Sequence, residues 1–309
     1  MTKVFIDGSA GTTGLRIYDR LSERKEIELI ILSDEVRKDI AARKEALNAA
    51  DIAFLCLPDA AAIEAVGLVN NPNTAIIDTS TAHRTNDGFV YGFPELKGLR
   101  EKIKNSKRIA NPGCHASGFI ALVAPLVEAG IIKPDAMLSC FSLTGFSGGG
   151  KKMIAEYESD NIDPLFLAPR QYGLSGAHKH LPEMAKVCGL INAPSFQPIV
   201  ANFYSGMEVT VPLFASQIKG SVEDIKEVYK NYYGGGLVSF VENADEQGFM
   251  SAAALSGRDD MQIAVCGSKE NPVLVARFDN LGKGASGAAI QNMNILLGVD
   301  EATGLKRGE

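Results

Sequence analysis

The amino-acid sequence predicts an α/β protein of two domains: a first domain with strands and helices alternating around a parallel sheet, then an α+β domain with a mainly antiparallel sheet. Its 309 residues suit two domains, each with its own core. Short apolar segments alternate with helical patterns up to residue 113, and longer stretches of alternating apolar and polar residues follow. We therefore expect domains at residues 1–113 and 114–282, with a C-terminal helix at 283–309 joining the first.

Composition and charge are typical of an ordinary globular enzyme. The chain is 46% hydrophobic and 22% charged, and its net charge of −6, without any basic run, argues against a nucleic-acid partner. No apolar run approaches the roughly 18 residues of a membrane span, and no signal-peptide pattern opens the chain. The 5 cysteines are scattered without a CxxC pair, which fits reduced thiols and neither disulfides nor a zinc site. We expect a cytoplasmic protein without membrane or metal.

The first element is a strand, a glycine loop and a helix in immediate succession. Lys3 to Asp7 has a strand pattern, the loop Gly-Ser-Ala-Gly-Thr-Thr-Gly follows, and a helical pattern runs from Leu15 to Leu21. The first glycine would permit the tight turn, the second the close approach of a pyrophosphate, and the third close helix–strand packing. This setting predicts a Rossmann-type dinucleotide site, with these candidate cofactor-binding residues: Gly8, Ser9, Gly11, Thr12, Thr13 and Gly14.

Further strand–helix units continue the first domain. Ile27 to Leu32, Ile52 to Leu57 and Ala75 to Asp78 are buried strand patterns, each with helical or turn residues behind it. Which nicotinamide cofactor binds is open at this level. Ser33 and Arg37, just beyond the second strand, could accept a ribose 2′-phosphate, whereas Asp34 would repel one.

The strongest chemical candidate is Cys114. Asn-Pro-Gly is turn chemistry, and the apolar residues from Phe119 to Val127 recur at helical spacing. Cys114 is therefore expected where a turn becomes a helix, beside backbone N–H groups and the positive end of the helix dipole, which favour the nucleophilic thiolate. The alternative is a small buried cysteine packed under a turn.

The second domain shows a change of pattern. Apolar and polar residues alternate over residues 137–144, 208–215, 262–267 and 273–278, which predicts a largely antiparallel sheet with one covered face. The glycine-rich stretch from Ser147 to Lys151 is either a hinge or a loop that contacts the cofactor. A helix over Ala285–Leu297 follows Gly-Lys-Gly, and its start could face an anion.

Two of the chain's 4 histidines, His178 and His180, stand two residues apart. A metal site is a poor interpretation because no further ligand spacing completes one. A structural role at the start of the helix opened by Pro182 is one alternative; a general base to the thiol and acid to a developing oxyanion is the other. Side chains two apart share a face in a regular strand, so only local irregularity would divide their roles. We expect His180 to be the acid–base partner of Cys114 and His178 to position substrate.

A nucleotide loop, an activated cysteine and a histidine together indicate one chemistry. A thiolate attacks an acyl phosphate or an aldehyde, and the resulting thioester or thiohemiacetal exchanges hydride with a nicotinamide.

The order of motifs also resembles the N-acetyl-γ-glutamyl-phosphate reductase family of the semialdehyde dehydrogenase superfamily, in its short form, along nearly the whole chain. The motifs that carry the resemblance are the loop at 8–14, Asp-Thr-Ser-Thr-Ala-His-Arg at 78–84, Tyr-Gly-Phe-Pro-Glu at 91–95, Asn-Pro-Gly-Cys at 111–114, Ser-Gly at 147–148 with Lys151, His-x-His-x-Pro-Glu at 178–183, Asp-Asn-Leu-Gly-Lys-Gly at 279–284 and Gln-Asn-Met-Asn at 291–294. Departures are His115, Ser117, Ser205 and Gly282, where the family usually carries other residues.

The resemblance implies NADPH-dependent reduction of N-acetyl-L-glutamyl 5-phosphate to its 5-semialdehyde and phosphate, in arginine biosynthesis, through a thioester on Cys114, by a homodimer or homotetramer. It makes Arg84 a candidate for a substrate phosphate or carboxylate, with a surface ion pair as the alternative. It places four residues near the cofactor: Ser147, Gly148, Asn280 and Asn292. Lys283 is a further candidate, with a solvated lysine as the alternative. Alternatives are the same chemistry on aspartyl or carrier-linked aminoadipyl phosphate, or a non-catalytic NAD(P) sensor.

Overall fold

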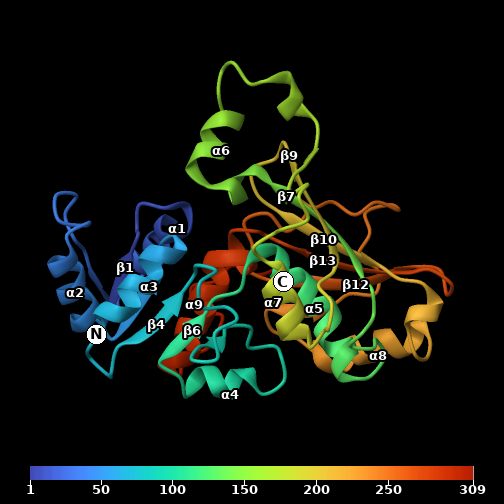
Figure 1. Ribbon diagram of the computed structural model, residues 1–309, viewed down its shortest axis with the longest axis horizontal. Coiled ribbons are helices and arrows are strands. Elements are labelled where there is room, and N and C mark those ends of the chain that lie inside the picture. Colours follow the sequence, from blue (N-terminus) through green and yellow to red (C-terminus); the bar gives the residue numbers. More distant parts are fainter. Residues whose placement is uncertain (309) are drawn as a thin grey trace. The chain divides into compact units, whose positions relative to one another are not determined.

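The computed structural model describes residues 1–308, which form two compact units (Figure 1). One unit comprises Met1–Pro112 and Ala285–Leu305, and the other comprises Gly113–Gly284 with residues 306–308. Glu309, the last residue of the expected C-terminal segment 283–309, lies outside the described residues. The predicted fold class is confirmed: a parallel Rossmann-like sheet in one unit and a mixed sheet in the other.

The first unit is built on a six-stranded sheet in the order β2-β1-β3-β4-β6-β5, in which every pairing is parallel. Its strands are β1 (Thr2–Asp7), β2 (Ile27–Ile30), β3 (Ile52–Leu55), β4 (Ala75–Asp78), β5 (Val90–Tyr91) and β6 (Arg108–Ala110). Its helices are α1 (Thr12–Ser22), α2 (Ile40–Ala49), α3 (Asp59–Leu68), α4 (Leu99–Lys104) and, from the end of the chain, α9 (Gly287–Leu297).

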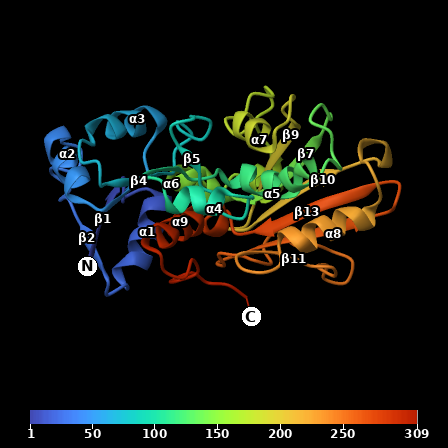
Figure 2. The same cartoon turned by 90° about the horizontal axis from the view of Figure 1, so that it is seen from below.

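Both faces of this sheet are covered, which explains its nearly continuous apolar strands. Val4 and Ile6 of β1 point to one face and pack in a cluster that includes Ile17 of α1 and Met293 of α9. Phe5 points to the other face, among side chains of α2 and α3. The C-terminal helix α9 therefore completes the core of the first unit. Figure 2 shows it beside α1.

The second unit carries a seven-stranded sheet in the order β11-β12-β13-β10-β7-β9-β8. Its strands are β7 (Ser139–Gly145), β8 (Arg170–Gln171), β9 (Ser195–Ala201), β10 (Met207–Pro212), β11 (Val238–Phe240), β12 (Met261–Gly267) and β13 (Pro272–Phe278). Four of the six pairings are antiparallel, as expected, and the β7–β9 and β11–β12 pairs are parallel.

Helices α5 (Cys114–Glu128) and α8 (Val222–Tyr232) pack on this sheet, and α7 (Leu181–Cys188) packs on α5. Alternate residues of β10 are buried and the residues between them are partly exposed, so the strand has one covered face. A Cβ on Gly118 would lie 2.5 Å from Val209 Cγ2, so this glycine permits α5 to lie close to β10.

The chain between β7 and β9 extends beyond the ends of these strands, as the green segment in Figure 1 shows. It contains the short 3₁₀ helices η1 (Phe146–Gly149) and η2 (Pro164–Leu167) and helix α6 (Gly150–Tyr157). A small apolar cluster of its own, around Phe146 and Tyr157, includes Tyr172.

The final helix begins later than predicted. Gly282–Ser286 form a π-helical turn, η4, and the regular helix α9 starts only at Gly287. Asp279 explains part of this start because its Oδ1 accepts hydrogen bonds from the backbone N–H groups of Leu281 (2.6 Å) and Gly282 (3.1 Å). Within residues 1–308 no helix is long and apolar enough to cross a membrane.

Candidate active site

Cys114 is the first residue of α5, the place predicted from the Asn-Pro-Gly turn. Gly113 is the N-cap, in extended conformation, and no side chain caps the helix. The thiol is partly buried, and Gly284 lies against it: a Cβ on that glycine would be 3.0 Å from Cys114 Cβ. The thiol therefore lies at the N-terminus of α5, the positive end of the helix dipole.

The other four cysteines are poorer nucleophiles. Burial raises the pKa of the thiols of Cys140 and Cys188, and raises that of Cys56 to about 12. Cys266 is exposed, but partial burial and the nearby carboxylates of Asp245 and Glu208 raise its pKa. A raised pKa leaves little thiolate at neutral pH.

The two histidines of the predicted acid–base segment are held in an irregular turn just before α7. The backbone N–H of His180 donates to Nδ1 of His178 over 3.2 Å, and the ring centroids are 4.8 Å apart. His180 is 4% exposed and serves as the N-cap residue of α7. His178 is half-buried, and burial followed by the charge of Lys179 lowers its pKa. The local irregularity that would divide the two roles is present.

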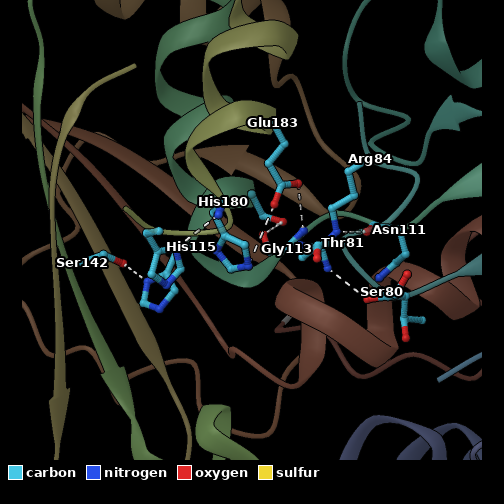
Figure 3. A network of polar contacts seen from close by, with 12 residues as sticks. Ser80, Thr81, Arg84, Asn111, Gly113, His115, Ser142, His180 and Glu183 are labelled. Atoms are coloured by element: carbon cyan, nitrogen blue, oxygen red, sulfur yellow. Dashed lines mark hydrogen bonds and ion pairs between the residues drawn. The ribbon is translucent and has the colours of Figure 1, made fainter. Parts of the chain in front are cut away.

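Glu183 connects this segment to the residue before Cys114. Its carboxylate is 1% exposed; Oε2 accepts a hydrogen bond from the Gly113 N–H at 3.3 Å, and Oε1 lies 3.9 Å from His180 Nε2 (Figure 3). A carboxylate at this distance forms an ion pair with the protonated imidazole and stabilises that charged form. Glu183 belongs to the sequence motif at 178–183 but had no predicted role; its i+3 spacing from His180 was the available indication.

His115 also belongs to this neighbourhood. Its ring centroid lies 5.7 Å from that of His178 and 5.6 Å from that of His180. Its Nδ1 is 2.6 Å from Ser142 Oγ and its Nε2 is 2.6 Å from the Tyr172 hydroxyl. Three histidines thus meet, yet within residues 1–308 no group of three or more His, Cys, Asp or Glu side chains could hold a metal.

Arg84 lies in the first unit and supports two loops there. Its Nε donates to the carbonyl of Asn111 and its Nη2 to the carbonyl of Thr79, each over 3.0 Å (Figure 3). Nearby, the buried Asp78 accepts from Ser80 and pairs with His83 Nδ1 at 2.6 Å. These bonds give Arg84 a structural task, and its contact with substrate stays a prediction.

The glycine loop of the first unit has the geometry expected of a dinucleotide site. Gly8 has a φ of +90°, and a Cβ there would lie 2.3 Å from the Cys56 carbonyl oxygen. A Cβ on Gly14 would lie 2.5 Å from the Gly8 carbonyl oxygen, which accounts for close packing of helix and loop. A Cβ on Gly11 would come no nearer than 3.4 Å to any such atom, so the fold itself does not demand glycine at this place.

A cavity of about 270 Å³ adjoins this loop. Asp7, Gly8 and Ser9 line it, together with the apolar end of β2 and the basic side chains of Arg37, Lys38 and Arg43. This mixture of apolar walls and positive charge fits a nucleotide. Of the side chains predicted to select the cofactor, Arg37 lines the cavity and Ser33 does not. Lys38 was missed, although it directly follows Arg37.

Two acidic side chains of this region form ion pairs with arginines. Asp34, expected to repel a 2′-phosphate, pairs with Arg37 at 2.9 Å between Oδ1 and Nε. The buried Asp7 pairs with Arg43 at 2.9 Å, and burial raises the pKa of Asp7 although the guanidinium opposes this.

The remaining predicted cofactor residues fall into two places. In the second unit, Asn280 Nδ2 donates to Ser147 Oγ over 3.0 Å, and a Cβ on Gly148 would be 3.4 Å from the same nitrogen. In the first unit, the fully buried Asn292 donates through Nδ2 to the Gly92 carbonyl at 2.9 Å. Lys283 is 1% exposed. Each of these residues is buried or contacts another part of the protein, and its contact with the cofactor stays a prediction.

Replacing Gly11 by valine is expected to raise the KM for the cofactor at least tenfold while leaving the melting temperature within a few degrees of wild type. A Cβ at this place makes only ordinary van der Waals contact with protein atoms, and the added side chain occupies the space that a pyrophosphate needs. Steady-state kinetics and thermal unfolding check this. Gly67→Val, on an exposed helix position where a Cβ meets nothing, is the matched control. Unaltered cofactor binding in Gly11→Val would contradict the placement.

Two models of known protein families match parts of this chain. The NAD-binding domain of semialdehyde dehydrogenases matches residues 3–106, and the semialdehyde dehydrogenase dimerisation domain matches residues 114–280. Solved structures show the same fold: aspartate semialdehyde dehydrogenase II from Vibrio cholerae has a TM-score of 0.71 at 17% identity, covering 96% of this chain and 98% of that one. The enzyme from Candida albicans, solved with NADP, has a TM-score of 0.66 at 16% identity, covering 95% and 98%.

The fold and the cysteine–histidine site therefore define a semialdehyde dehydrogenase. N-acetyl-gamma-glutamyl-phosphate reductase 2 of Nostoc sp. is 44% identical, covering 98% of this chain and 99% of the relative. The N-acetyl-gamma-glutamyl-phosphate reductase of Brucella ovis is 46% identical, covering 96% and 99%. The chain belongs to the N-acetyl-γ-glutamyl-phosphate reductase family.

Proposed function

We propose that this chain reduces N-acetyl-L-glutamyl 5-phosphate to N-acetyl-L-glutamate 5-semialdehyde and phosphate with NADPH, through a thioester on Cys114, as a step of arginine biosynthesis. The observation that carries the proposal is the carboxylate of Glu183, which contacts the Gly113 N–H and lies 3.9 Å from His180 Nε2. It joins an acid–base histidine to the start of the helix that bears the cysteine. The near full-length relatives named for this activity support the choice of substrate.

The residues of the second unit divide the chemistry as follows. His180 accepts the proton of the Cys114 thiol as the sulfur attacks the acyl carbon, and the charged imidazole then stabilises the oxyanion. The carbon–oxygen bond to phosphate breaks, the proton leaves with the phosphate, and the thioester remains. Bound NADPH supplies the hydride that reduces this thioester. Collapse of the resulting tetrahedral adduct releases the aldehyde and returns the thiolate. Glu183 acts earlier, by stabilising the charged form of His180 while this residue holds the thiol proton.

The first unit holds the dinucleotide in this proposal, and NADP is favoured over NAD. The glycine loop leaves space at Gly11, and the adjoining cavity presents Arg37, Lys38 and Arg43. A 2′-phosphate adds negative charge that such side chains stabilise. The pairing of Asp34 with Arg37 reduces the repulsion that Asp34 would otherwise exert.

Lys38→Ala is expected to lower kcat/KM for NADPH about tenfold and to change that for NADH by less than twofold, because only NADPH carries the 2′-phosphate. A charge-assisted hydrogen bond contributes about 1.5–3 kcal/mol, and about 1.4 kcal/mol corresponds to tenfold. Initial rates with both cofactors measure this. Lys44→Ala removes another exposed lysine, outside the cavity, and should leave both values unchanged. An equal loss with both cofactors would contradict recognition of the 2′-phosphate by Lys38.

We further propose a homodimer or homotetramer, assembled through the second unit, in the cytoplasm. Along β7 the side chains of Cys140, Ser142 and Thr144 are buried, whereas Phe141 on the other face is 47% exposed. An open sheet face with an exposed aromatic side chain favours association. The family model that matches residues 114–280 is described as a dimerisation domain, which supports association through this unit. Within the described residues no cysteine is part of a disulfide, which supports a reducing compartment.

The substrate is tested by phosphate-dependent reduction of NADP⁺ with three aldehydes. We expect N-acetylglutamate semialdehyde to give the highest kcat/KM, at least a hundredfold above aspartate semialdehyde and a carrier-linked aminoadipate semialdehyde. A preference for either of the other two would retain the chemistry and overturn the substrate. No activity with any aldehyde would support the non-catalytic NAD(P) sensor.

A further inference from the structure

A second feature of the site is a chain of three polar side chains, Ser142, His115 and Tyr172. Ser142 lies in the middle of β7 and is fully buried, and His115, the neighbour of Cys114, is 3% exposed. Figure 3 shows the contact between Ser142 and His115. Nδ1 of His115 lies 2.6 Å from the serine hydroxyl, and Nε2 lies 2.6 Å from the tyrosine hydroxyl. The mechanism above uses none of these groups.

The imidazole of His115 is neutral. Burial, followed by the charges of His178 and Lys179, lowers its pKa to about 3. A neutral imidazole carries one hydrogen, so one ring nitrogen donates and the other accepts. The chain of hydrogen bonds therefore has two possible directions.

In one direction Tyr172 donates to Nε2, Nδ1–H donates to Ser142, and the serine hydrogen needs a further acceptor. No other hydrogen-bond partner of Ser142 Oγ occurs among residues 1–308, and a buried hydroxyl without an acceptor costs roughly 1–3 kcal/mol. In the other direction Ser142 donates to Nδ1 and Nε2–H donates to the Tyr172 oxygen. The hydroxyl hydrogen left over is then that of Tyr172, which is partly exposed and can reach another acceptor, whereas Ser142 is fully buried, so this second direction is favoured.

The favoured direction turns the hydroxyl hydrogen of Tyr172 away from His115. Within the described chain this hydroxyl has no other hydrogen-bond partner. Tyr172 stands close enough to Cys114 that a negative charge on the sulfur opposes ionisation of the phenol and, with burial as the larger cause, raises its pKa. The phenol therefore keeps its hydrogen, and the sulfur whose charge it senses belongs to Cys114, the chain neighbour of His115.

We propose that His115 is a positioning residue: held in the Nε2–H form by Ser142, it directs the Tyr172 hydroxyl hydrogen toward the negative charge on Cys114. Tyr172 is then a hydrogen-bond donor that stabilises the thiolate. The inference rests on the proposed function only in taking Cys114 as the nucleophile.

The first test observes the tautomer in the wild-type protein. Long-range ¹⁵N–¹H spectra of protein labelled on its 4 histidines identify which ring nitrogen of each carries hydrogen, and the spectrum of His115→Gln assigns the resonances. We expect His115 protonated on Nε2 alone between pH 6 and 9. A hydrogen on Nδ1 would overturn the inference and leave the proposed function untouched, because the measurement requires no substrate.

The second test measures the thiolate of Cys114 through the pH dependence of its alkylation by iodoacetamide. Tyr172→Phe, which removes the donor, should raise the apparent pKa of the thiol by about one unit, which is tenfold in thiolate at neutral pH. His115→Phe keeps an aromatic ring beside Phe196 but loses both hydrogen bonds, and should reproduce most of this shift. His115→Gln retains an amide N–H that reaches the Tyr172 oxygen, and should restore most of the wild-type value.

These variants distinguish orientation from packing. If His115→Phe and His115→Gln alkylate alike, the imidazole acts through its volume and the inference is wrong. An unshifted profile in Tyr172→Phe contradicts the contact with the thiolate. Circular dichroism and thermal unfolding of each variant identify misfolding, and the tautomer measured in the wild type stands independently of them.

Discussion

Replacing Cys114 by serine is expected to abolish turnover and to leave the fold intact. The serine hydroxyl fits the space at the start of α5, but at neutral pH it supplies almost no oxyanion to attack an acyl carbon. Loss of a nucleophile in a hydrolase costs about 10⁶-fold in kcat, so a loss of several orders of magnitude is expected here. Steady-state assays and thermal unfolding of the purified variant provide the measurement.

Selective labelling supplies the control. Iodoacetamide should inactivate the wild-type protein with the label on Cys114, ahead of the exposed Cys266, whose raised pKa leaves less thiolate. Cys266→Ser should be as active as wild type and inactivated at the same rate. Equal labelling of all five cysteines, or an active Cys114→Ser enzyme, would show that the nucleophile lies elsewhere.

His180→Asn is expected to lower kcat by about 10²–10⁴-fold and to remove one limb of the pH profile of kcat/KM, because a general acid–base group contributes that factor. Asparagine retains a polar side chain at the N-cap of α7 but cannot exchange a proton. Initial rates at varied substrate concentration across pH 5–10, with cofactor saturating, give kcat and kcat/KM separately and so distinguish this effect from weaker binding.

The neighbouring histidine is the natural comparison. His178→Asn should mainly raise the KM for the aldehyde or acyl phosphate, since His178 is half-buried and borders His180. The reverse pattern would exchange the two roles. Near-wild-type kinetics in both variants would remove the segment from the active site, whatever its proximity to Gly113 through Glu183.

The local patterns of the sequence predicted most of the fold. The strand, glycine loop and helix at residues 2–22 lie where expected because turn residues and the hydrophobic period act within a few positions. The same reasoning placed Cys114 at a helix start. The two parallel pairs of the second sheet were not predicted, because strand order depends on which distant segments meet, and alternation alone is the same for parallel and antiparallel neighbours.

The side chains around Cys114 were predicted less completely. His178 and His180 were found because two histidines in one short segment are conspicuous among four. Ser142 and Tyr172 were missed because each is an ordinary residue in its own segment; they acquire a role only when β7 and the segment before α7 bring them to His115. Contacts across distant segments leave no periodic pattern in the sequence.

The central claim is that a thioester forms on Cys114, and a single-turnover experiment without phosphate tests it most directly. The enzyme is mixed with N-acetylglutamate 5-semialdehyde and excess NADP⁺ in phosphate-free buffer, and NADPH is followed before and after phosphate is added. We predict a burst of one NADPH per chain, an acyl group on the Cys114 peptide by mass spectrometry, and steady turnover once phosphate is present. A protein that shows no burst and carries no acyl group on Cys114, yet turns over with phosphate, would contradict the thioester mechanism.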